Sequence, residues 1–509
     1  METQQYEIVT VGTGEGSKFL AWTLGKQGKR VAVIERKYIG GSCPNIACLP
    51  SKNVIHSAKV ASYFRRSEEF GISKEGFRID MSAVRDRKRR MVKDLVAIHA
   101  ANFKTSGAEL IMGSAKFTAP KTIEASLNEG GTRLIRGEKI EAVGPRSDIE
   151  ALLTSDTQTI DAGGRVVAPG FVDAHTHLVF AGNRADEFEM RCSGITYQEI
   201  SKQGGGILST VRRTRAATES DLLATAQKHA SWFLRGGTTT IEAKSGYGLS
   251  VEAELKILRV IQQTDQSTPL RCVPTFLGAH EIPTEFHGRT PAYVELVIQE
   301  MLPLVAAQKL ARFCDVFCEP HIFDQQAAGR ILEAARRLGF GLRIHADQFT
   351  CSGGAKLAAS LNAATADHLE HTDAASIAAL AAAKVQPVLL PGSVYSIGLK
   401  QYPPARAMID AGLAVVLATD FNPGSSPIAS MPVVLSLACT QMKMTPAEAL
   451  TAATVNAAWS LNLASQVGSL EPGKLANFVI HEGTDYREIP YFLGTQRPAM
   501  VFAQGERVA

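Results

Sequence analysis

The sequence predicts an α/β protein in which a (β/α)8 barrel is preceded by a partial, Rossmann-like βαβ segment over residues 1–135. Eight apolar runs alternate with amphipathic helical stretches over residues 171–463, which is the pattern of a parallel barrel. Short strand signals at 136–170 and 464–509 predict a small, sandwich-like β-domain built from both sides of the barrel. A glycine-rich turn between a strand and a helix near the start predicts the βαβ segment.

Length and composition are those of a chain with two or three domains. The 509 residues are 45% apolar and 20% charged, and the net charge is only +4. The sequence has neither a run of 18 apolar residues nor a basic leader, so we expect no membrane span and no signal peptide. Eight cysteines spread over this length do not form a secreted disulfide framework, and we expect a cytoplasmic protein.

Basic residues concentrate in the first segment. Residues 1–135 hold 22 Lys and Arg against 13 Asp and Glu, and the excess peaks at RDRKRR, residues 85–90. Such a run can bind nucleic acid, but no aromatic residues interleave it. A solvated helix face explains it better, and we expect no nucleic-acid partner. The contrast with the acidic remainder indicates that two unlike segments are joined in one chain.

The first segment opens with the order strand, glycine turn, helix, strand in YEIVTVGTGEGSKFLAWTLGKQGKRVAVIER. Glu35 ends the second strand, about where a ribose-binding acid belongs. Ser17 takes the place of the third glycine of the usual pattern, so a plain tight turn is the alternative to dinucleotide binding. Three glycines lie where the backbone of a βαβ unit approaches a pyrophosphate: Gly12, Gly14 and Gly16.

Two cysteines, Cys43 and Cys48, follow in GGSCPNIACLPSK. This stretch resembles the redox-active segment of the pyridine nucleotide-disulfide oxidoreductases, especially their mercuric-reductase-like members. The resemblance covers about residues 1–135 and implies an FAD-binding fold with Cys43 and Cys48 as a redox pair. An FAD-dependent thiol-disulfide or metal-ion reductase is therefore the alternative function. The sequence lacks the second glycine fingerprint and the C-terminal region of that family, so we expect a fragment that binds FAD weakly or not at all.

Two helices of the barrel region have clear boundaries in the sequence. One runs from about Thr218 to Arg235 and is closed by Gly236. The other begins at TPAE, where Thr445 and Glu448 form a capping box and a proline occupies the first helical position.

The apolar runs of the barrel region end in polar residues or glycine-rich turns. The carboxyl ends of parallel barrel strands meet on one face, where active sites are built. Buried polar groups cost stability unless they have partners, so their clustering there is informative. In chain order the eight runs are FVDAHTH, TTTIEAKSGYG, CVPTFLGAH, DVFCEP, LRIHADQ, ATADHLEH, VQPVLLPG and AVVLATDFNPGSS.

The first of these strands ends in two histidines that can chelate a metal. His175 and His177 flank one residue, so both side chains point to the same side. His345 on the fifth strand and Asp420 on the eighth can supply a third and a fourth ligand. Each residue alone is more often structural, but the four together predict a metal site. This ligand set suits zinc, iron or nickel and leaves the metal open.

The constellation resembles the amidohydrolase superfamily and, within it, the imidazolonepropionase family. The resemblance covers about residues 137–509 and implies a metal-dependent hydrolase with one divalent metal, zinc or iron, acting as a homodimer on a small molecule. The implied reaction is hydrolysis of the cyclic amide of 4-imidazolone-5-propanoate to N-formimidoyl-L-glutamate in histidine degradation. The motifs that carry it are FVDAHTHLVFAGNRADEF, KSGYGLS, TFLGAHEIP, HADQF, ADHLEHT and ATDFNPGSSP.

The resemblance also implies a role for individual residues. From the chemistry of hydrolysis we expect Asp420 to take the proton of the attacking water, His280 to help to stabilise the oxyanion, and His368 to orient Asp420 or relay the proton. Arg184 can hold the substrate carboxylate bidentately, and Tyr247 can add a hydroxyl donor. The implied metal ligands are His175, His177, His345 and Asp420. The implied substrate contacts are Arg184, Tyr247, His280, Gln348, Asn422, Gly424 and Ser425.

Three other polar residues near strand ends are weighed differently. For Glu242, a role in supporting the site and a role in packing are about equally expected. For Glu319 and His321 a structural role is favoured. The small β-domain is expected to lack its first strands and to expose a sheet edge. Either the first segment supplies a replacement strand, or the chain is a gene fusion or a sequence-assembly artefact.

Overall fold

The computed structural model divides the chain into two compact units. One comprises Met1–Lys139 and Gly144–Ile160, and the other Ile140–Val143 and Asp161–Ala509. No helix in the described part of the chain combines the length and the apolar character needed to span a bilayer. The structure describes every residue except 1–2, 7, 47, 74–75, 77, 120–121, 131, 137–138, 141–142, 146–148, 150–158, 197–198, 201–203 and 496.

The first unit is built on a six-stranded mixed sheet in the order β1-β6-β5-β4-β3-β2. α1 (Glu15–Lys26) connects β2 to β3, and these two strands are parallel. A small core buries Ala32, Ile34 and Ile111 on one side of the sheet. The strands are β1 (Thr3–Gln5), β2 (Ile8–Val11), β3 (Val31–Glu35), β4 (Glu109–Ala119), β5 (Thr122–Leu127) and β6 (Thr132–Arg136).

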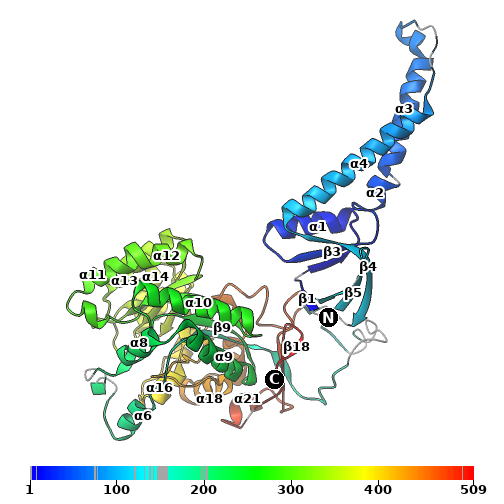
Figure 1. Ribbon diagram of the computed structural model, residues 1–509. Coiled ribbons are helices and arrows are strands. Elements are labelled where there is room, and N and C mark those ends of the chain that lie inside the picture. Colours follow the sequence, from blue (N-terminus) through cyan, green and yellow to red (C-terminus); the bar gives the residue numbers. More distant parts are fainter. Residues whose placement is uncertain are drawn as a thin grey trace. The chain divides into compact units, whose positions relative to one another are not determined.

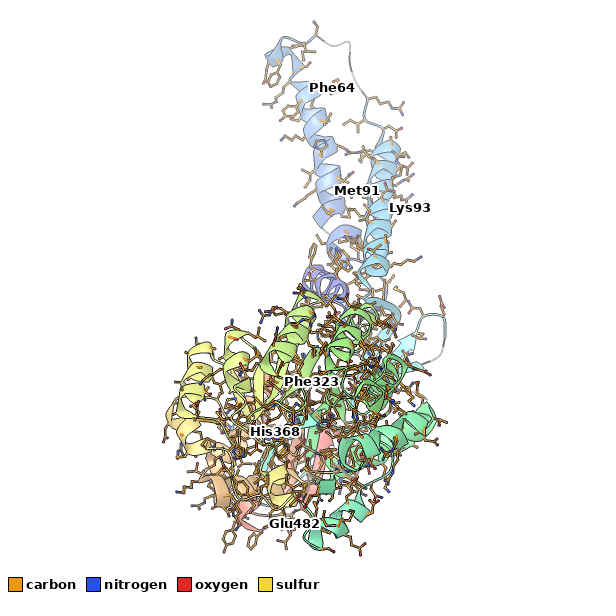
Figure 2. All side chains as sticks on the ribbon, turned by 90° about the vertical axis from the view of Figure 1, so that its left-hand side faces the viewer. Phe64, Met91, Lys93, Phe323, His368 and Glu482 are labelled. Atoms are coloured by element: carbon orange, nitrogen blue, oxygen red, sulfur yellow. The ribbon has the colours of Figure 1, made fainter. Side chains whose placement is uncertain are left out.

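A long helical hairpin of α3 (Cys48–Arg65) and α4 (Met81–Ser106) belongs to this unit (Figure 1). Asp80 caps α4 by accepting the backbone N–H groups of Ser82 and Ala83, as an N-cap carboxylate does. The basic run at 85–90 lies on α4 with its side chains exposed or half-buried, which is the predicted helix face. Figure 2 shows Phe64, Met91 and Lys93 along the two helices of the hairpin.

The second unit contains the predicted parallel barrel. Its sheet has the order β15-β14-β13-β12-β11-β10-β9-β8, so all eight predicted strands form and each lies beside its neighbour in the chain. The pairing is parallel throughout. The strands are β8 (Phe171–Thr176), β9 (Thr238–Lys244), β10 (Arg271–Ala279), β11 (Phe313–Cys318), β12 (Gly341–Ala346), β13 (Thr365–His368), β14 (Gln386–Leu389) and β15 (Val416–Leu417).

The barrel closes where the first strand meets the segment that follows the last. The backbone N–H of Asp420 donates to the carbonyl of His175 at 3.0 Å, and that of His177 donates to the carbonyl of Phe421 at 2.8 Å. An isolated parallel bridge between Thr176 and Phe421 completes this seam. Closure thus brings residues 175–177 and 420–421 together, although they are far apart in the sequence.

Helices surround the strands of this unit in Figure 1. α9 (Glu219–Arg235) begins after Thr218, with a complete capping box, and ends at Gly236 as predicted. The helix predicted at TPAE is α19 (Pro446–Ala452), and Thr445 and Glu448 form its capping box. Apolar side chains between strands and helices form one large buried core that includes Phe233, Ile257 and Leu332.

A four-stranded antiparallel sheet in the order β18-β17-β16-β7 lies in the same unit. It uses segments from both sides of the barrel in the sequence, and Ile140 adds backbone hydrogen bonds to residues 473 and 474. Part of the strand expected at 136–145 lies outside the described residues. The strands are β7 (Val167–Pro169), β16 (Phe478–His481), β17 (Pro498–Ala503) and β18 (Glu506–Arg507).

Candidate active site

The four predicted metal ligands meet inside the mouth of the barrel. The Nε2 atoms of His175 and His177 lie 3.5 and 3.6 Å from the same oxygen, Oδ1 of Asp420. The ring nitrogens of His345 come within 4.8 Å of those of His175 and of His177. All four side chains are buried, which is costly for polar groups unless they are paired or ligate a metal. The structure therefore brings together residues from β8, β12 and the end of β15.

The unpaired nitrogens of this cluster fit a metal ion. Nδ1 of His175 lies 2.6 Å from Oδ2 of Asp367, so Nδ1 carries the proton and Nε2 keeps its lone pair. Nδ1 of His345 lies 3.0 Å from Oδ2 of Asp315, which is an ion-pair distance without hydrogen-bond geometry. Nε2 of both rings is buried and has no hydrogen-bond partner among the described residues. Such carboxylate-backed imidazoles are the usual ligands of zinc and iron.

Electrostatics keep these imidazoles in the neutral, ligating form. Burial, followed by the nearby Lys244 ammonium, lowers the pKa of His175 well below its ordinary value. Burial and the neighbouring His280 likewise lower the pKa of His177. Burial also raises the pKa of Asp420 to about 6. Neutral histidines and one carboxylate are the protonation states that bind a divalent ion.

His368, which is labelled in Figure 2, is buried beside two of the four ligands. Its ring nitrogens approach those of His175 and His345 within 4.8 Å, and its Nδ1 is 3.5 Å from Oε1 of Glu370. Burial by itself lowers the pKa of His368, but Glu370 and the more distant Asp420 outweigh it and raise that pKa. The backbone of His368 has φ of 79° and that of Asp420 has φ of 54°, a region that functional residues occupy at a cost of about 1–3 kcal/mol.

A cavity of about 360 Å³ opens beside the ligands. Arg184 lies in its wall, and Nε of this arginine donates to Glu187 at 2.8 Å. Its guanidinium also lies directly against the Cα of Gly424. Six of the seven predicted substrate contacts line the cavity, and the seventh, Gly424, contacts Arg184. The six are Arg184, Tyr247, His280, Gln348, Asn422 and Ser425.

The side chain of Asn422 organises its own loop. Its Oδ1 accepts the backbone N–H groups of Gly424 and Ser425, both at 2.8 Å. Its Nδ2 donates to the carbonyl of Asp420 at 2.7 Å and to Oγ of Ser425 at 2.9 Å. These bonds use the hydrogen-bonding groups of the amide. Asn422 thus shapes the turn that carries Asp420 and supports Arg184.

The tautomer of His280 follows from its backbone contact. Its Nδ1 lies 3.0 Å from the carbonyl oxygen of Gly246 and must donate a proton to it. Burial, followed by nearby His345, lowers the pKa of His280 to about 3, so the ring is neutral. Its Nε2 therefore faces its surroundings as an acceptor. Donation from His280 to an oxyanion, as expected from the sequence, requires a proton that this tautomer does not carry there.

Several cavity residues were not predicted as contacts. Glu281 and His321 line the cavity together with Phe317 and Phe349. The sequence favours a structural role for His321, and nothing in it separates Phe317 and Phe349 from packing residues. Glu319 accepts the backbone N–H of Phe349 at 2.9 Å and thereby fixes the loop that follows β12. The adjacency of Glu281 to His280 was the one available signal.

The first unit uses its predicted site residues differently. Oε2 of Glu35 accepts the backbone N–H and the hydroxyl of Thr13 at 2.9 and 2.7 Å, and Oε1 accepts the N–H groups of Lys37 and Tyr38. The carboxylate is thus committed to its own turn rather than open to a ribose. A Cβ on Gly12 or on Gly14 would meet nothing within 4 Å.

The predicted redox pair is described only in part. Cys43 lies half-buried on α2 (Ser42–Asn45), and Cys48 begins α3, with its side chain outside the described residues. Gly16 lies in the first turn of α1.

Comparison with known proteins identifies the family. The amidohydrolase family matches residues 166–508. An imidazolonepropionase of Solibacter usitatus (strain Ellin6076) is 61% identical over 391 residues, which cover 77% of this chain and 94% of the relative. The chain belongs to the imidazolonepropionase family of amidohydrolases. An imidazolonepropionase of Symbiobacterium thermophilum is 47% identical over 76% of this chain and 91% of its own.

Solved structures share the fold of this amidohydrolase. A 5-methylcytosine deaminase from Klebsiella pneumoniae superimposes with a TM-score of 0.57 at 17% identity, over 78% of this chain and 97% of its own. A triazine hydrolase variant superimposes with a TM-score of 0.58 at 18% identity, over 75% and 91%. These structures show the fold alone, and the family match and the imidazolonepropionase relatives show that the chain is a hydrolase.

Proposed function

We propose that this chain hydrolyses the cyclic amide of 4-imidazolone-5-propanoate to N-formimidoyl-L-glutamate, a step of histidine degradation. One observation carries the proposal: the cluster of three histidines and Asp420 opens on a cavity whose wall holds the Arg184 guanidinium. The cluster suits hydrolysis of an amide, and the guanidinium suits the carboxylate tail of this substrate. The names of the relatives agree with this reaction.

We assign the metal to His175, His177, His345 and Asp420, as one zinc or iron ion per chain. Three imidazoles with one carboxylate are common ligands of both metals. A bound divalent ion supplies Lewis acidity and lowers the pKa of water from 15.7 to about 7. Elemental analysis of the purified protein and of a His175→Ala variant tests the assignment.

The protein groups then act on the attacking water and on the leaving nitrogen. Asp420 accepts one proton of the water while the water oxygen forms a bond to the ring carbonyl carbon. The C–N bond of the cyclic amide breaks, and Asp420 passes that proton to the leaving ring nitrogen. His368, whose nitrogens lie near those of two ligands, orients Asp420 or relays the proton.

The remaining cavity residues hold the substrate. Arg184, fixed by Glu187, receives the propanoate carboxylate in a bidentate pair, and Tyr247 adds a donor. Nε2 of His280 accepts a hydrogen bond from a ring N–H, in agreement with its tautomer. Gln348 and Ser425 complete the polar wall, and Asn422 and Gly424 keep the turn beneath Arg184 in place.

Isotope-labelled water tests this chemistry directly. Turnover in H₂¹⁸O should place one heavy oxygen in the newly formed carboxylate of N-formimidoyl-glutamate, as mass spectrometry would detect. Asp420→Asn and His368→Ala should both slow this reaction. An Asp420→Asn protein with full metal content and full turnover contradicts the role of Asp420, and an unchanged His368→Ala protein contradicts that of His368.

For residues 1–135 we propose a partial flavoprotein-like segment with Cys43 and Cys48 as its thiol pair. The parallel βαβ unit and the open backbone at Gly12 and Gly14 support it, whereas the commitment of Glu35 to its own turn argues for weak FAD binding or none. Flavin fluorescence released from the denatured protein tests this. We also propose that the protein is a homodimer, which light scattering of the purified protein tests. We further propose that it is cytoplasmic, which cell fractionation tests.

A further inference from the structure

The ammonium of Lys244 lies at the centre of a buried charge cluster beneath the metal site. Lys244 ends β9, and its side chain is completely buried. Its Nζ lies 2.8 Å from Glu242 Oε1, 2.7 Å from Asp315 Oδ2 and 3.6 Å from Asp367 Oδ2. The three carboxylates come from β9, β11 and β13, alternate strands whose inward side chains share a layer of the barrel.

Two of these carboxylates contact the ligand histidines through the same oxygen that contacts Lys244. Oδ2 of Asp315 lies 2.7 Å from Nζ of Lys244 and 3.0 Å from Nδ1 of His345. Oδ2 of Asp367 lies 3.6 Å from that Nζ and 2.6 Å from Nδ1 of His175. The ammonium of Lys244 therefore contacts both the carboxylate beside His345, on β12, and the carboxylate beside His175, on β8.

We propose that Lys244 is a positioning residue of the metal centre, which holds Asp315 and Asp367 so that His345 and His175 present their Nε2 atoms to the same ion. The inference rests on the proposed ligand set. The proposal adds to the metal centre a residue that is neither an assigned ligand nor part of the cavity wall. Arg343 supports Asp367 as well, because its Nε lies 3.9 Å from Oδ2 of Asp367.

Charge balance explains why a lysine occupies this position. Glu242, Asp315 and Asp367 form a buried group of three carboxylates, and among the residues that the structure describes only Lys244 and Arg343 pair with this group as permanent cations. Burial alone lowers the pKa of Lys244, but the three carboxylates outweigh it and raise that pKa, so the ammonium persists. Without the ammonium, the three buried carboxylates would repel one another, and Asp315 and Asp367 would move away from the imidazoles that they orient.

Metal affinity measures this role more directly than activity does. A carboxylate behind a ligating histidine typically contributes 10–100-fold to metal affinity. Lys244→Met should therefore lower the affinity for Zn²⁺, measured by competition with a chelator, by about 10–100-fold. The visible spectrum of the Co²⁺-loaded variant should also change, because it reports ligand geometry and not stability.

Lys256 provides the matched control. Its Nζ, on α10 (Val251–Ser267), donates to the carbonyls of Thr214, Arg215 and Ala217 at 3.1, 3.0 and 2.7 Å, away from the metal ligands. Lys256→Met removes a lysine of similar connectivity and should lower stability while leaving Zn²⁺ affinity and the Co²⁺ spectrum unchanged. A loss of affinity in both variants would make the effect one of stability and would overturn the proposal.

Asp315→Asn keeps the test decisive if Lys244→Met does not fold. It preserves the shape of the side chain but removes the charge that connects Lys244 to His345. Wild-type Zn²⁺ affinity in folded Lys244→Met, or in Asp315→Asn, would overturn the inference while leaving the proposed function intact. A wild-type protein that binds no metal would overturn the ligand set and this inference with it.

Discussion

Replacing Gly424 with alanine should displace Arg184 and weaken the recognition of the substrate carboxylate. A Cβ on Gly424 would lie 2.8 Å from Nη2 of Arg184, with Cζ and Nη1 closer still, whereas real Cβ atoms do not approach a heavy atom within 3.0 Å. Ordinary contact requires about 3.5–4.0 Å, so the nearest atom of the guanidinium must retreat by about 1.5–2 Å. Glu187 still holds Nε of Arg184, so the planar group rotates away from its carboxylate-binding position.

The size of the effect follows from the bonds that are lost. Hydrogen bonds to charged groups contribute about 1.5–3 kcal/mol, which corresponds to a ~10–150-fold fall in kcat/KM at 1.4 kcal/mol per factor of ten. The assay compares 4-imidazolone-5-propanoate with an analogue that lacks the carboxylate. We expect the loss with the natural substrate and nearly equal kcat/KM for the two proteins with the analogue.

Gly329→Ala is the control for this variant. A Cβ on Gly329, in α13 (Gln325–Arg337), would meet only Leu357 Cδ1, at an ordinary 3.6 Å. Its kinetics should therefore match the wild type. Wild-type kcat/KM in Gly424→Ala, or an equal loss on both substrates, would refute the assignment of Arg184 to the carboxylate.

Three other outcomes can be measured by unfolding. Thr445→Ala removes the capping box of α19 and should lower the free energy of unfolding by about 1 kcal/mol. Hydrogen bonds from Arg406 lower the pKa of Glu448 from 4.5 to about 2. The contribution of Glu448 to stability is therefore complete above pH 4.5 and disappears as the pH falls from 4.5 to 2. Over that interval the free energy of unfolding of Glu448→Gln should fall less than that of the wild type. Removing the metal with a chelator should lower the free energy of unfolding by about 2.7 kcal/mol, compared with a solution in which the free metal concentration is 100 times its Kd. Thermal unfolding with and without chelator measures this difference.

Local sequence signals predicted the parts of the fold that depend on neighbouring residues. The helix at Glu219–Arg235 was predictable because Thr218 caps it and Gly236 ends it, both within one turn of the helix. Strand ends were predictable for the same reason, because an apolar run followed by His or Asp is visible without any partner strand. The proximity of His175 and Asp420 could be predicted only on the assumption that the barrel is closed. The backbone hydrogen bonds between residues 175–177 and 420–421 show this closure in the structure.

Contacts across the barrel were not predictable from the sequence. Lys244 is one lysine in KSGYG, and its three carboxylate partners become apparent only when the alternate strands β9, β11 and β13 point their side chains into the same barrel. The tautomer of His280 depends on the carbonyl of Gly246, 34 residues away. The commitment of Glu35 to the turn at Thr13 likewise depends on how β3 lies against the glycine turn.

The measurement that tests the central claim most directly is turnover of 4-imidazolone-5-propanoate as a function of bound metal. The metal-free protein is titrated with Zn²⁺ or Fe²⁺, and N-formimidoyl-glutamate is quantified at each metal content, with His175→Ala titrated in parallel. We predict product formation that rises in proportion to bound metal, reaches its maximum at one ion per chain and is lost in His175→Ala. A folded, metal-loaded protein without turnover, or a His175→Ala variant with wild-type metal content and rate, would contradict the account.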